Sequence, residues 1–393
     1  MKLIKGWKLE SVGELFEVQL GKMINAKARS GDHQLPYMTN CNVQWGRIKL
    51  TDIRKMYFSE KDKEKFRLKS GDLLVCEGGE VGRCAIWRNQ LEECYYQKAL
   101  HRLRPKSDQV LNTFTYYFLE FASGSRLISN STSRSSIAHL TREKFTQILI
   151  PLPTLPEQQK IAEILGTCDE AIEAQERLIA KKQQLKKGLM QKLLTGEVRF
   201  PEFERTPWRS VKASELFTTR SEKNTNEEPV LSVTQDVGIL LRSSVERRIS
   251  GASKNFPNYK MVYPRDFVIS LRSFQGGLEY SQIKGAVSPA YHVIHKKREL
   301  CEEFYRHFFK SWEFIGRLKT ATIGIRDGKQ IAFRDFSFMR LPAPAIAEQQ
   351  AISGLLCEYD KEITLQQNKL EQLKQQKRSL MQQLLTGKVR VKI

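Results

Sequence analysis

Apolar residues recur at alternating steps of four and three over two long stretches of the chain, 157–195 and 348–386. This spacing places side chains on one face of an α-helix and is typical of a coiled-coil seam. At roughly 1.5 Å per residue, each predicted helix is on the order of 58 Å long. The predicted seam comprises Ile161, Leu165, Ile172, Ile179, Leu189 and Leu193 in the first helix, and Ile352, Leu356, Ile363, Leu370, Leu373, Leu380 and Leu384 in the second.

The two stretches are copies of one unit. Glu157-Gln158-Gln159 returns as Glu348-Gln349-Gln350, and the segment ending at Arg199 returns as the segment ending at Arg390, always 191 positions later (348 minus 157, and 390 minus 199). A glycine that tolerates positive φ follows each helix, at Gly196 and Gly387. Two equal helices in one chain can pair with each other, although each could instead pack only on its own domain.

Polar residues interrupt the seam. Gln175 and Gln366 occupy equivalent positions of the two copies, and Lys182, Lys186 and Lys377 fall in the C-terminal halves. A polar seam residue weakens a coiled coil but fixes its register, because mispairing would leave the polar group without a partner.

The regions before the helices also repeat, more faintly. Short apolar runs such as 230–233 and 267–269 alternate with turn residues and indicate strands, whereas the aromatic-rich stretches 114–121 and 301–312 indicate core helices. The predicted fold class is α+β, with two tandem strand-rich mixed α/β domains at 1–156 and 200–346. Each is followed by a helical spacer, at 157–199 and 347–393, and the two spacers pair as an antiparallel coiled coil.

The net charge is +21, and almost all of it lies outside the two helices. Such a surface suits a polyanion, although a merely soluble basic protein is the alternative. The seven cysteines include no Cys-x-x-Cys pair, so neither a disulfide framework nor a zinc site is expected. There is no apolar run long enough for a membrane span and no apolar leader, so we expect a cytoplasmic protein without a membrane partner.

Enzyme motifs are missing from the sequence. It has no phosphate-binding loop, no methyltransferase Asp/Asn-Pro-Pro-Tyr/Phe loop and no His-Glu-x-x-His helix. His292 and His295 lie in a strand pattern that would turn them to opposite faces. The carboxylates Asp72, Glu77 and Glu80 lack the nearby lysine of a nuclease cluster. We therefore expect no catalytic residue, no metal site and no cofactor in this chain.

Polar loop residues are the remaining candidates, as contacts to double-stranded DNA. Arginine can read guanine and amides can read adenine, while lysine neutralises phosphate; any one of these side chains could instead be simply solvated. The candidates are Lys22, Lys27, Arg29, Gln44, Arg47 and Arg134 in the first domain, and Arg220, Lys223, Gln235, Arg242, Arg272, Gln275, Arg326 and Lys329 in the second.

The segments 151–162 and 189–199, with their second copies, resemble those of the specificity subunit of Type I restriction-modification enzymes. Ala347 departs from the proline expected before Glu348. The resemblance implies two target recognition domains that each read half of a split DNA sequence, with the paired helices as spacer. It further implies a non-catalytic reader that docks two modification (methyltransferase) subunits and, through them, restriction subunits. S-adenosylmethionine, ATP and Mg would then be bound by those partners.

Two other functions stay open. A coiled-coil scaffold with basic domains would bind nucleic acid nonspecifically, so any polyanion would compete equally. An unrecognised nuclease would cut DNA alone, with a metal ion.

Overall fold

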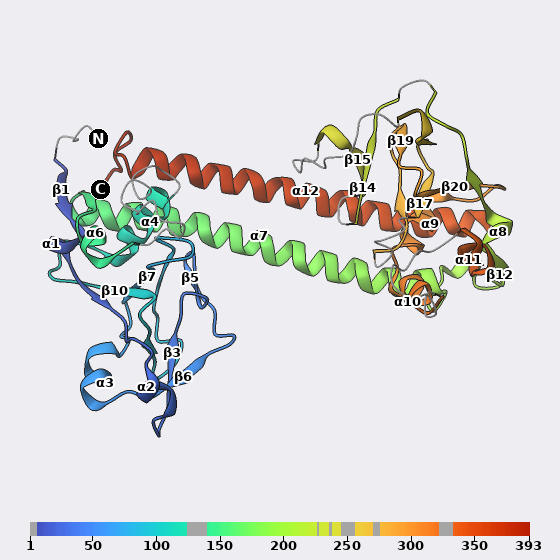
Figure 1. The fold of residues 1–393 in the computed structure, drawn as a ribbon. Coiled ribbons are helices and arrows are strands. Elements are labelled where there is room, and N and C mark those ends of the chain that lie inside the picture. Colours follow the sequence, from blue (N-terminus) through green and yellow to red (C-terminus); the bar gives the residue numbers. More distant parts are fainter. Residues whose placement is uncertain are drawn as a thin grey trace. The chain divides into compact units, whose positions relative to one another are not determined.

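The computed structural model describes residues 6–123, 140–225, 228–235, 238–244, 256–269, 276–321 and 333–393. The chain divides into two compact units (Figure 1). The first unit comprises Met1–Glu176 and Lys369–Ile393, and the second unit comprises Arg177–Asn368. The division passes through both long helices, so each unit contains part of each.

The first unit contains a four-stranded antiparallel sheet of order β2-β10-β7-β8, formed by β2 (Phe16–Leu20), β10 (Leu100–Pro105), β7 (Leu73–Cys76) and β8 (Cys84–Ile86). Around it lie β1 (Lys8–Ser11) paired with β11 (Leu149–Leu152), a small sheet β6 (Arg54–Met56), β3 (Leu35–Met38) and β9 (Tyr95–Tyr96), and the hairpin β4 (Val43–Gln44) and β5 (Arg47–Ile48). Its short helices are α1 (Val12–Leu15), α2 (Ala26–Ser30), α3 (Glu60–Phe66), α4 (Asn112–Ser123) and α6 (Arg142–Thr146).

The second unit repeats this plan. Its four-stranded sheet has the equivalent order β13-β20-β17-β18, from β13 (Phe217–Arg220), β20 (His292–Lys296), β17 (Phe267–Ile269) and β18 (Glu279–Tyr280). The pairs β12 (Arg209–Lys212) with β21 (Arg340–Ala343), β14 (Leu231–Thr234) with β15 (Gly238–Leu241), and β16 (Lys260–Val262) with β19 (Gly285–Val287) surround it. The helices are α8 (Ala213–Leu216), α9 (Glu302–Phe308), α10 (Trp312–Ala321) and α11 (Phe333–Phe338), with 3-10 turns at Pro201–Phe203, Arg242–Ser244 and Phe256–Asn258. The predicted mixed, duplicated fold is confirmed.

The two long helices are α7 (Leu155–Thr195) and α12 (Ile346–Leu384). Each begins two residues before its predicted start. At the start of α7 the Thr154 hydroxyl donates to Glu157 Oε2 at 3.1 Å and the Thr154 amide donates to the same oxygen at 3.3 Å. The bond from the Thr154 amide satisfies one of the donors that the start of a helix leaves without a partner. Past the helices, Gly196 (φ +75°) and Gly387 (φ +65°) take the positive φ that was predicted.

The predicted seam is largely buried. Ile161, Leu165, Ile172 and Leu384 are buried in the first unit, and Ile179, Leu193, Ile352, Leu356 and Ile363 in the second, whereas Leu189, Leu370, Leu373 and Leu380 are half-buried. Gln175 is also buried, as expected of a polar seam residue.

Ion pairs between the helices fix their direction. In the first unit Asp169 lies 2.7 Å from Lys377, and Glu176 lies 3.3 Å from Lys374. In the second unit Lys182 binds Glu362 and Lys186 binds Asp360, each at 2.5 Å. Partner numbers on α12 fall as numbers on α7 rise, so the helices are antiparallel in both units. The seam lysines therefore have defined carboxylate partners.

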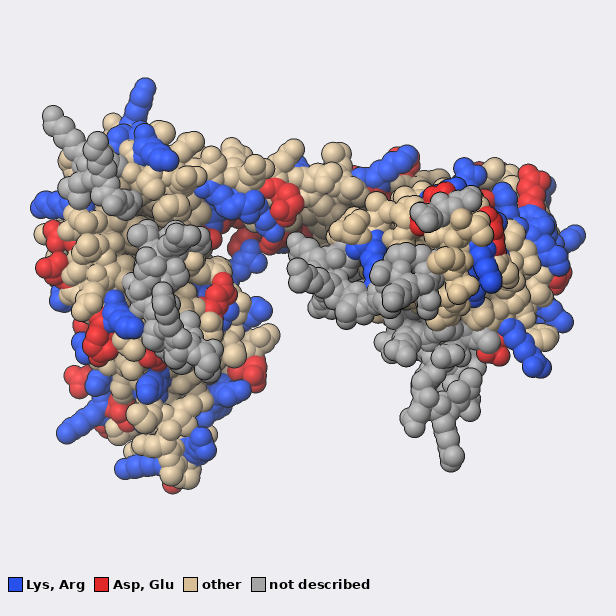
Figure 2. Space-filling view, turned by 45° about the horizontal axis from the view of Figure 1, so that its top comes forward, with Lys and Arg blue, Asp and Glu red and all other residues tan. Residues whose placement is uncertain are grey.

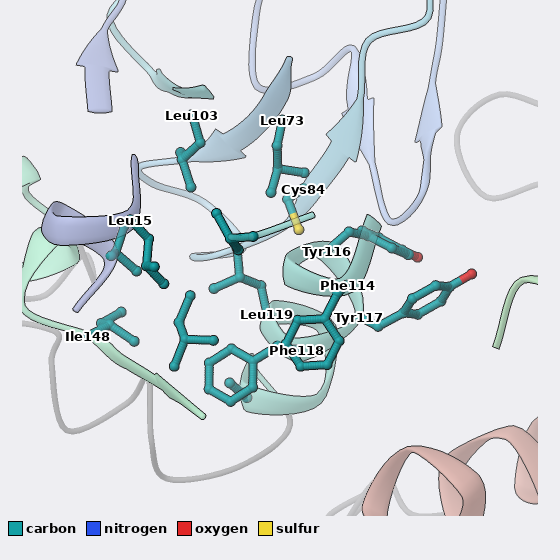
Figure 3. Packing of buried hydrophobic residues seen from close by; sticks show 14 of the residues in the cluster. Leu15, Leu73, Cys84, Leu103, Phe114, Tyr116, Tyr117, Phe118, Leu119 and Ile148 are labelled. Atoms are coloured by element: carbon teal, nitrogen blue, oxygen red, sulfur yellow. The ribbon is translucent and has the colours of Figure 1, made fainter. Parts of the chain in front are cut away.

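Each domain builds its core on the long helices. Figure 3 shows Phe114, Phe118 and Leu119 of α4 gathered with Leu15 and Ile148, and Ile161 of α7 and Leu385 after α12 belong to the same cluster. The aromatic residues of α4 are core, as predicted. In the second unit α9 contributes Phe304, Tyr305 and Phe308 to an equivalent cluster with Leu193, Leu194, Ile352 and Leu356 of the helices. Since each fully buried Phe or Leu contributes about 1.5–3 kcal/mol, these clusters fix each domain on its helix ends.

A separate core supports the small sheet of the first unit, with Ala28, Met38, Met56, Phe58 and Tyr95 among its members. None of the helices in the described part of the chain is long and apolar enough to cross a membrane.

Candidate nucleic-acid interface

Four exposed cations lie on two neighbouring elements of the first unit, two on α2 and two on β6. Ala28 of α2 is buried in the small core, and its carbonyl accepts a hydrogen bond from the Tyr57 amide, just after β6, at 2.9 Å. The Asn25 side chain caps α2 by accepting from the Ala28 amide at 2.9 Å. These bonds hold α2 against the edge strand β6. The basic surface, as we call this group, consists of Lys27 and Arg29 from α2 and Arg54 and Lys55 from β6.

The four side chains of the basic surface are exposed to solvent. The Lys27 ammonium lies 5.9 Å from the centroid of the Tyr57 ring. Lys27 and Arg29 were predicted from the sequence, but Arg54 and Lys55 were missed. Their signal was a pair of adjacent cations in the sequence. On the face drawn in Figure 2, Lys and Arg are interspersed with Asp and Glu, so local groups matter more than overall charge.

Lys22 is placed differently. Its side chain is 11% exposed, and its ammonium lies 2.7 Å from Asp62 Oδ2 and donates to the Tyr57 carbonyl at 2.7 Å. Burial would raise the pKa of Asp62, but the hydrogen bonds from Lys22 and Ser59 hold it below its ordinary value. Lys22 thus joins α3 to the end of β6 inside the domain.

Gln44 and Arg47 lie on the β4–β5 hairpin, against α7. Arg47 Nε is 2.9 Å from Glu173 and its Nη2 is 3.3 Å from Glu176, while the Gln44 amide donates to the Cys41 carbonyl at 3.0 Å. The hairpin, α4 and α7 line a groove of about 1190 Å³. Because these ion pairs are about half exposed, they contribute at most about 1 kcal/mol. Arg47 is therefore held weakly by the helix and apart from the basic surface.

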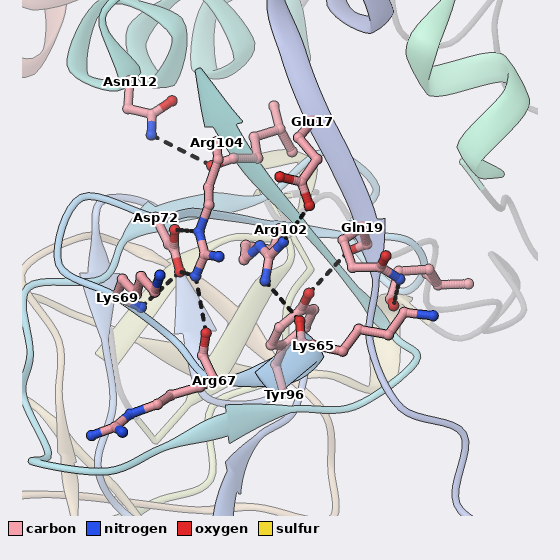
Figure 4. A network of polar contacts seen from close by, with 12 residues as sticks. Glu17, Gln19, Lys65, Arg67, Lys69, Asp72, Tyr96, Arg102, Arg104 and Asn112 are labelled. Atoms are coloured by element: carbon pink, nitrogen blue, oxygen red, sulfur yellow. Dashed lines mark hydrogen bonds and ion pairs between the residues drawn. The ribbon is translucent and has the colours of Figure 1, made fainter. Parts of the chain in front are cut away.

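Part of the positive charge is used inside the domain (Figure 4). Arg104 binds both oxygens of Asp72, at 2.6 and 2.8 Å, and the buried Arg102 binds Glu17 at 2.8 Å and the Lys65 carbonyl at 2.9 Å. Asp72, considered above as a nuclease carboxylate, is thus the counter-ion of Arg104 at the start of β7.

The second unit contains a similar arginine–aspartate ion pair. Arg220 of β13 binds Asp266 through Nε at 2.8 Å and Nη2 at 3.2 Å, and its guanidinium lies over the Tyr263 ring at 4.6 Å. The other described candidates, Lys223 and Gln235, are exposed, and Arg242 is half-buried. The predicted contacts Arg134, Arg272, Gln275, Arg326 and Lys329 lie outside the described residues.

The duplicated motif pairs reciprocally between its copies. Glu157 of the first copy binds Arg390 of the second at 2.5 Å. Glu348 of the second copy binds Arg199 of the first at 2.8 and 2.7 Å, and also accepts from Trp208 Nε1 at 2.9 Å. Both glutamates are essentially fully buried. The pairs Asp169–Lys377 and Asp360–Lys186 are equivalent to each other in the same way. The sequence shows these repeated residues but not which ones pair.

The glutamine after each glutamate fastens the helix to its own domain. Gln158 accepts from the Leu111 amide at 3.0 Å and donates to the Gln109 carbonyl at 2.8 Å. Gln349 likewise accepts from the Cys301 amide at 2.9 Å and donates to the Pro344 carbonyl at 2.8 Å. Buried amides with both ends satisfied fix one geometry, because a shifted helix would leave polar groups unpaired. The repeated Glu-Gln pair is thus the joint between domain and coiled coil.

Lys377 forms a second joint in the first unit. It is 7% exposed and lies 2.8 Å from Glu120 of α4 and 2.7 Å from Asp169 of α7. Burial raises the pKa of Glu120 even though Lys377 acts to lower it. The pKa of Lys377 is raised because the two carboxylates outweigh burial. This lysine therefore links the domain, α7 and α12 at once.

Comparison with known proteins identifies relatives over the whole chain. Residues 4–184 match the family model of the Type I restriction modification DNA specificity domain. The Type I restriction enzyme MjaVIII specificity subunit of Methanocaldococcus jannaschii is 24% identical, over 100% of this chain and 95% of its own length.

Two solved structures share the fold. The S subunit of a Type-I restriction-modification system from M. genitalium aligns with a TM-score of 0.57 at 16% identity, covering 98% of each chain. A chain from a structure of the type I R-M system that addresses complex assembly and conformational transition aligns with a TM-score of 0.60 at 17% identity, covering 98% of this chain and 99% of that one.

Proposed function

We propose that this chain is a specificity subunit of a Type I restriction-modification enzyme and that it reads a split, asymmetric DNA sequence. Residues 1–156 and 200–346 act as target recognition domains, and the antiparallel helices act as the spacer. The chain itself is non-catalytic and works in the cytoplasm. It docks two methyltransferase subunits, which bring S-adenosylmethionine, and restriction subunits join through these with ATP and Mg.

The reciprocal pairing of the duplicated motif carries this proposal. Equivalent residues that bind each other both ways are the pattern of a two-fold contact, as in a symmetric dimer. Dimeric DNA readers use such symmetry to place two similar domains on half-sites of opposite direction. Here the two copies are fused in one chain and their loops differ, so the two half-sites should differ in sequence.

The basic surface supplies the phosphate contacts of the first domain in this proposal. Phosphate contacts position a protein on the duplex but carry no sequence information. Each one lost should reduce the slope of log K against log salt by about 0.9. The double variant Lys27→Gln/Arg29→Gln, in complex with the methyltransferase subunits, should therefore bind DNA with a slope smaller by about 1.8 and an unchanged target sequence.

A matched control removes two exposed cations from α7, in Lys181→Gln/Lys187→Gln. Its salt slope should stay within experimental error of the wild type. An unchanged slope in the α2 variant would remove the basic surface from the DNA interface without touching the family assignment.

The decisive test is mapping of N6-methyladenine in DNA from cells that express this chain with its neighbouring methyltransferase. Cells that lack only this chain are the control. A split motif that depends on the chain is the expected result. An active methyltransferase that gives no chain-dependent motif would favour a nonspecific nucleic-acid scaffold, and metal-dependent cutting by the chain alone would favour a nuclease.

A further inference from the structure

Three potential metal ligands meet between α9 and α12 in the second unit. Glu303 and His307 lie one helical turn apart on α9, and Cys357 lies opposite on α12. Cys357 Sγ is 3.5 Å from His307 Nε2 and 3.9 Å from Glu303 Oε2. One ligand atom from each residue lies within 4.8 Å of the other two. The sequence did not predict this group, because 50 positions separate His307 from Cys357.

We propose that Glu303, His307 and Cys357 bind a divalent metal of the zinc class. A tetrahedral Zn²⁺ with Zn–S of about 2.3 Å and Zn–N of about 2.0–2.1 Å places its sulfur and nitrogen ligands about 3.5 Å apart. The observed separation of Sγ and Nε2 matches that value. The mixed nitrogen, sulfur and oxygen donors are those that zinc accepts, with the fourth position left for water.

The surroundings prepare these side chains for a metal. His307 is only 3% exposed, so its ring is held between α9 and α12. Metal binding would displace the Cys357 thiol proton to solvent as the sulfur–metal bond forms. Tyr280 and Arg306 donate to the two oxygens of Glu303 at 2.8 and 2.9 Å and orient the carboxylate, as outer partners of metal ligands do.

The cluster is an addition to the second copy of the duplicated unit. The positions 191 residues earlier hold Asn112, Tyr116 and Gly166, and their side chains provide no such set of ligands. The neighbouring pair Asp360–Lys186 does have its equivalent in the first copy. Helix pairing therefore does not require the three ligands. A bound metal would instead tie α9 of the second recognition domain directly to α12.

The test is a Co²⁺ titration of the metal-stripped full-length chain, with zinc content of the protein as purified measured in parallel. Thiolate coordination to Co²⁺ gives a charge-transfer absorption band, so we expect the band to saturate at one equivalent. Cys357→Ser should lose the band. Cys168→Ser, which removes a half-buried cysteine of α7 outside the cluster, should keep it.

His307→Ala should weaken Co²⁺ binding at least roughly tenfold, with folding checked by circular dichroism. A wild-type protein without the band, or an equal band in Cys357→Ser, would overturn the site. If Cys357→Ser does not fold, Glu303→Gln decides, because the metal site requires weaker Co²⁺ binding and a simple thiol–imidazole contact requires no change.

Discussion

The substitution Arg199→Met tests the joint between the second domain and the coiled coil. Glu348 is fully buried and accepts three hydrogen bonds, two from Arg199 and one from Trp208. Removing the guanidinium leaves a buried carboxylate with one donor. Breaking a buried pair from one side costs about 3–5 kcal/mol. Because Trp208 still donates and Arg199 is itself 14% exposed, we expect the lower end, about 3 kcal/mol.

The assay is urea unfolding followed by hydrogen-exchange mass spectrometry on peptides of the second unit, since the two units can unfold separately. With an m-value of about 2–3 kcal/mol/M, the loss lowers the urea midpoint by about 1–1.5 M. Arg205→Met removes an exposed arginine from the segment between α7 and β12, which also contains Arg199. It should change the free energy of unfolding by less than about 0.5 kcal/mol.

A double-mutant cycle with Glu348→Gln separates the pair from its surroundings. Once the carboxylate is neutral, loss of Arg199 costs little more, so the double variant should be only slightly less stable than Glu348→Gln alone. The coupling energy should reach about 2 kcal/mol. If the two single changes add within about 0.5 kcal/mol, the reciprocal pair does not join domain and helix as argued.

Three further outcomes follow from the described contacts. The pKa of Glu157 lies below its ordinary value of 4.5, because hydrogen bonds outweigh burial. The stability that ionised Glu157 contributes is therefore complete above about pH 4.5 and is lost as the pH falls through the folded-state pKa. Glu157→Gln should flatten the loss of thermal stability on acidification below about pH 5. Lys377→Met leaves two carboxylates without their cation and should lower the free energy of unfolding by about 3–5 kcal/mol. Lys374→Met removes a partly exposed ion pair and should lower it by under about 1 kcal/mol; both values are measured by urea unfolding of the first unit. Gly277→Ala places its Cβ against the Phe309 carbonyl oxygen at φ +80° and should lower the melting temperature. Gly188→Ala in α7 meets nothing within 4 Å and should stabilise the protein by about 1 kcal/mol; equal effects of the two substitutions would refute the steric argument.

The sequence by itself determined the long-range plan of this protein. The seam of α7 and α12, the glycines that end them and the tandem repeat are periodic or repeated features, which a linear sequence records directly. The strand and helix content of the domains followed from local patterns such as 267–269 and 114–121. The family resemblance rested on the same repeated segments.

Only the tertiary structure decided what individual charges do. Lys22 and Lys27 look alike in the sequence, yet one ammonium is bound to Asp62 and the other is exposed, because their partners come from distant segments. Arg220 is likewise occupied by Asp266, 46 positions away. Glu303, His307 and Cys357 meet only because α9 packs on α12. Such contacts depend on how elements pack, and local periodicity carries no information about packing partners.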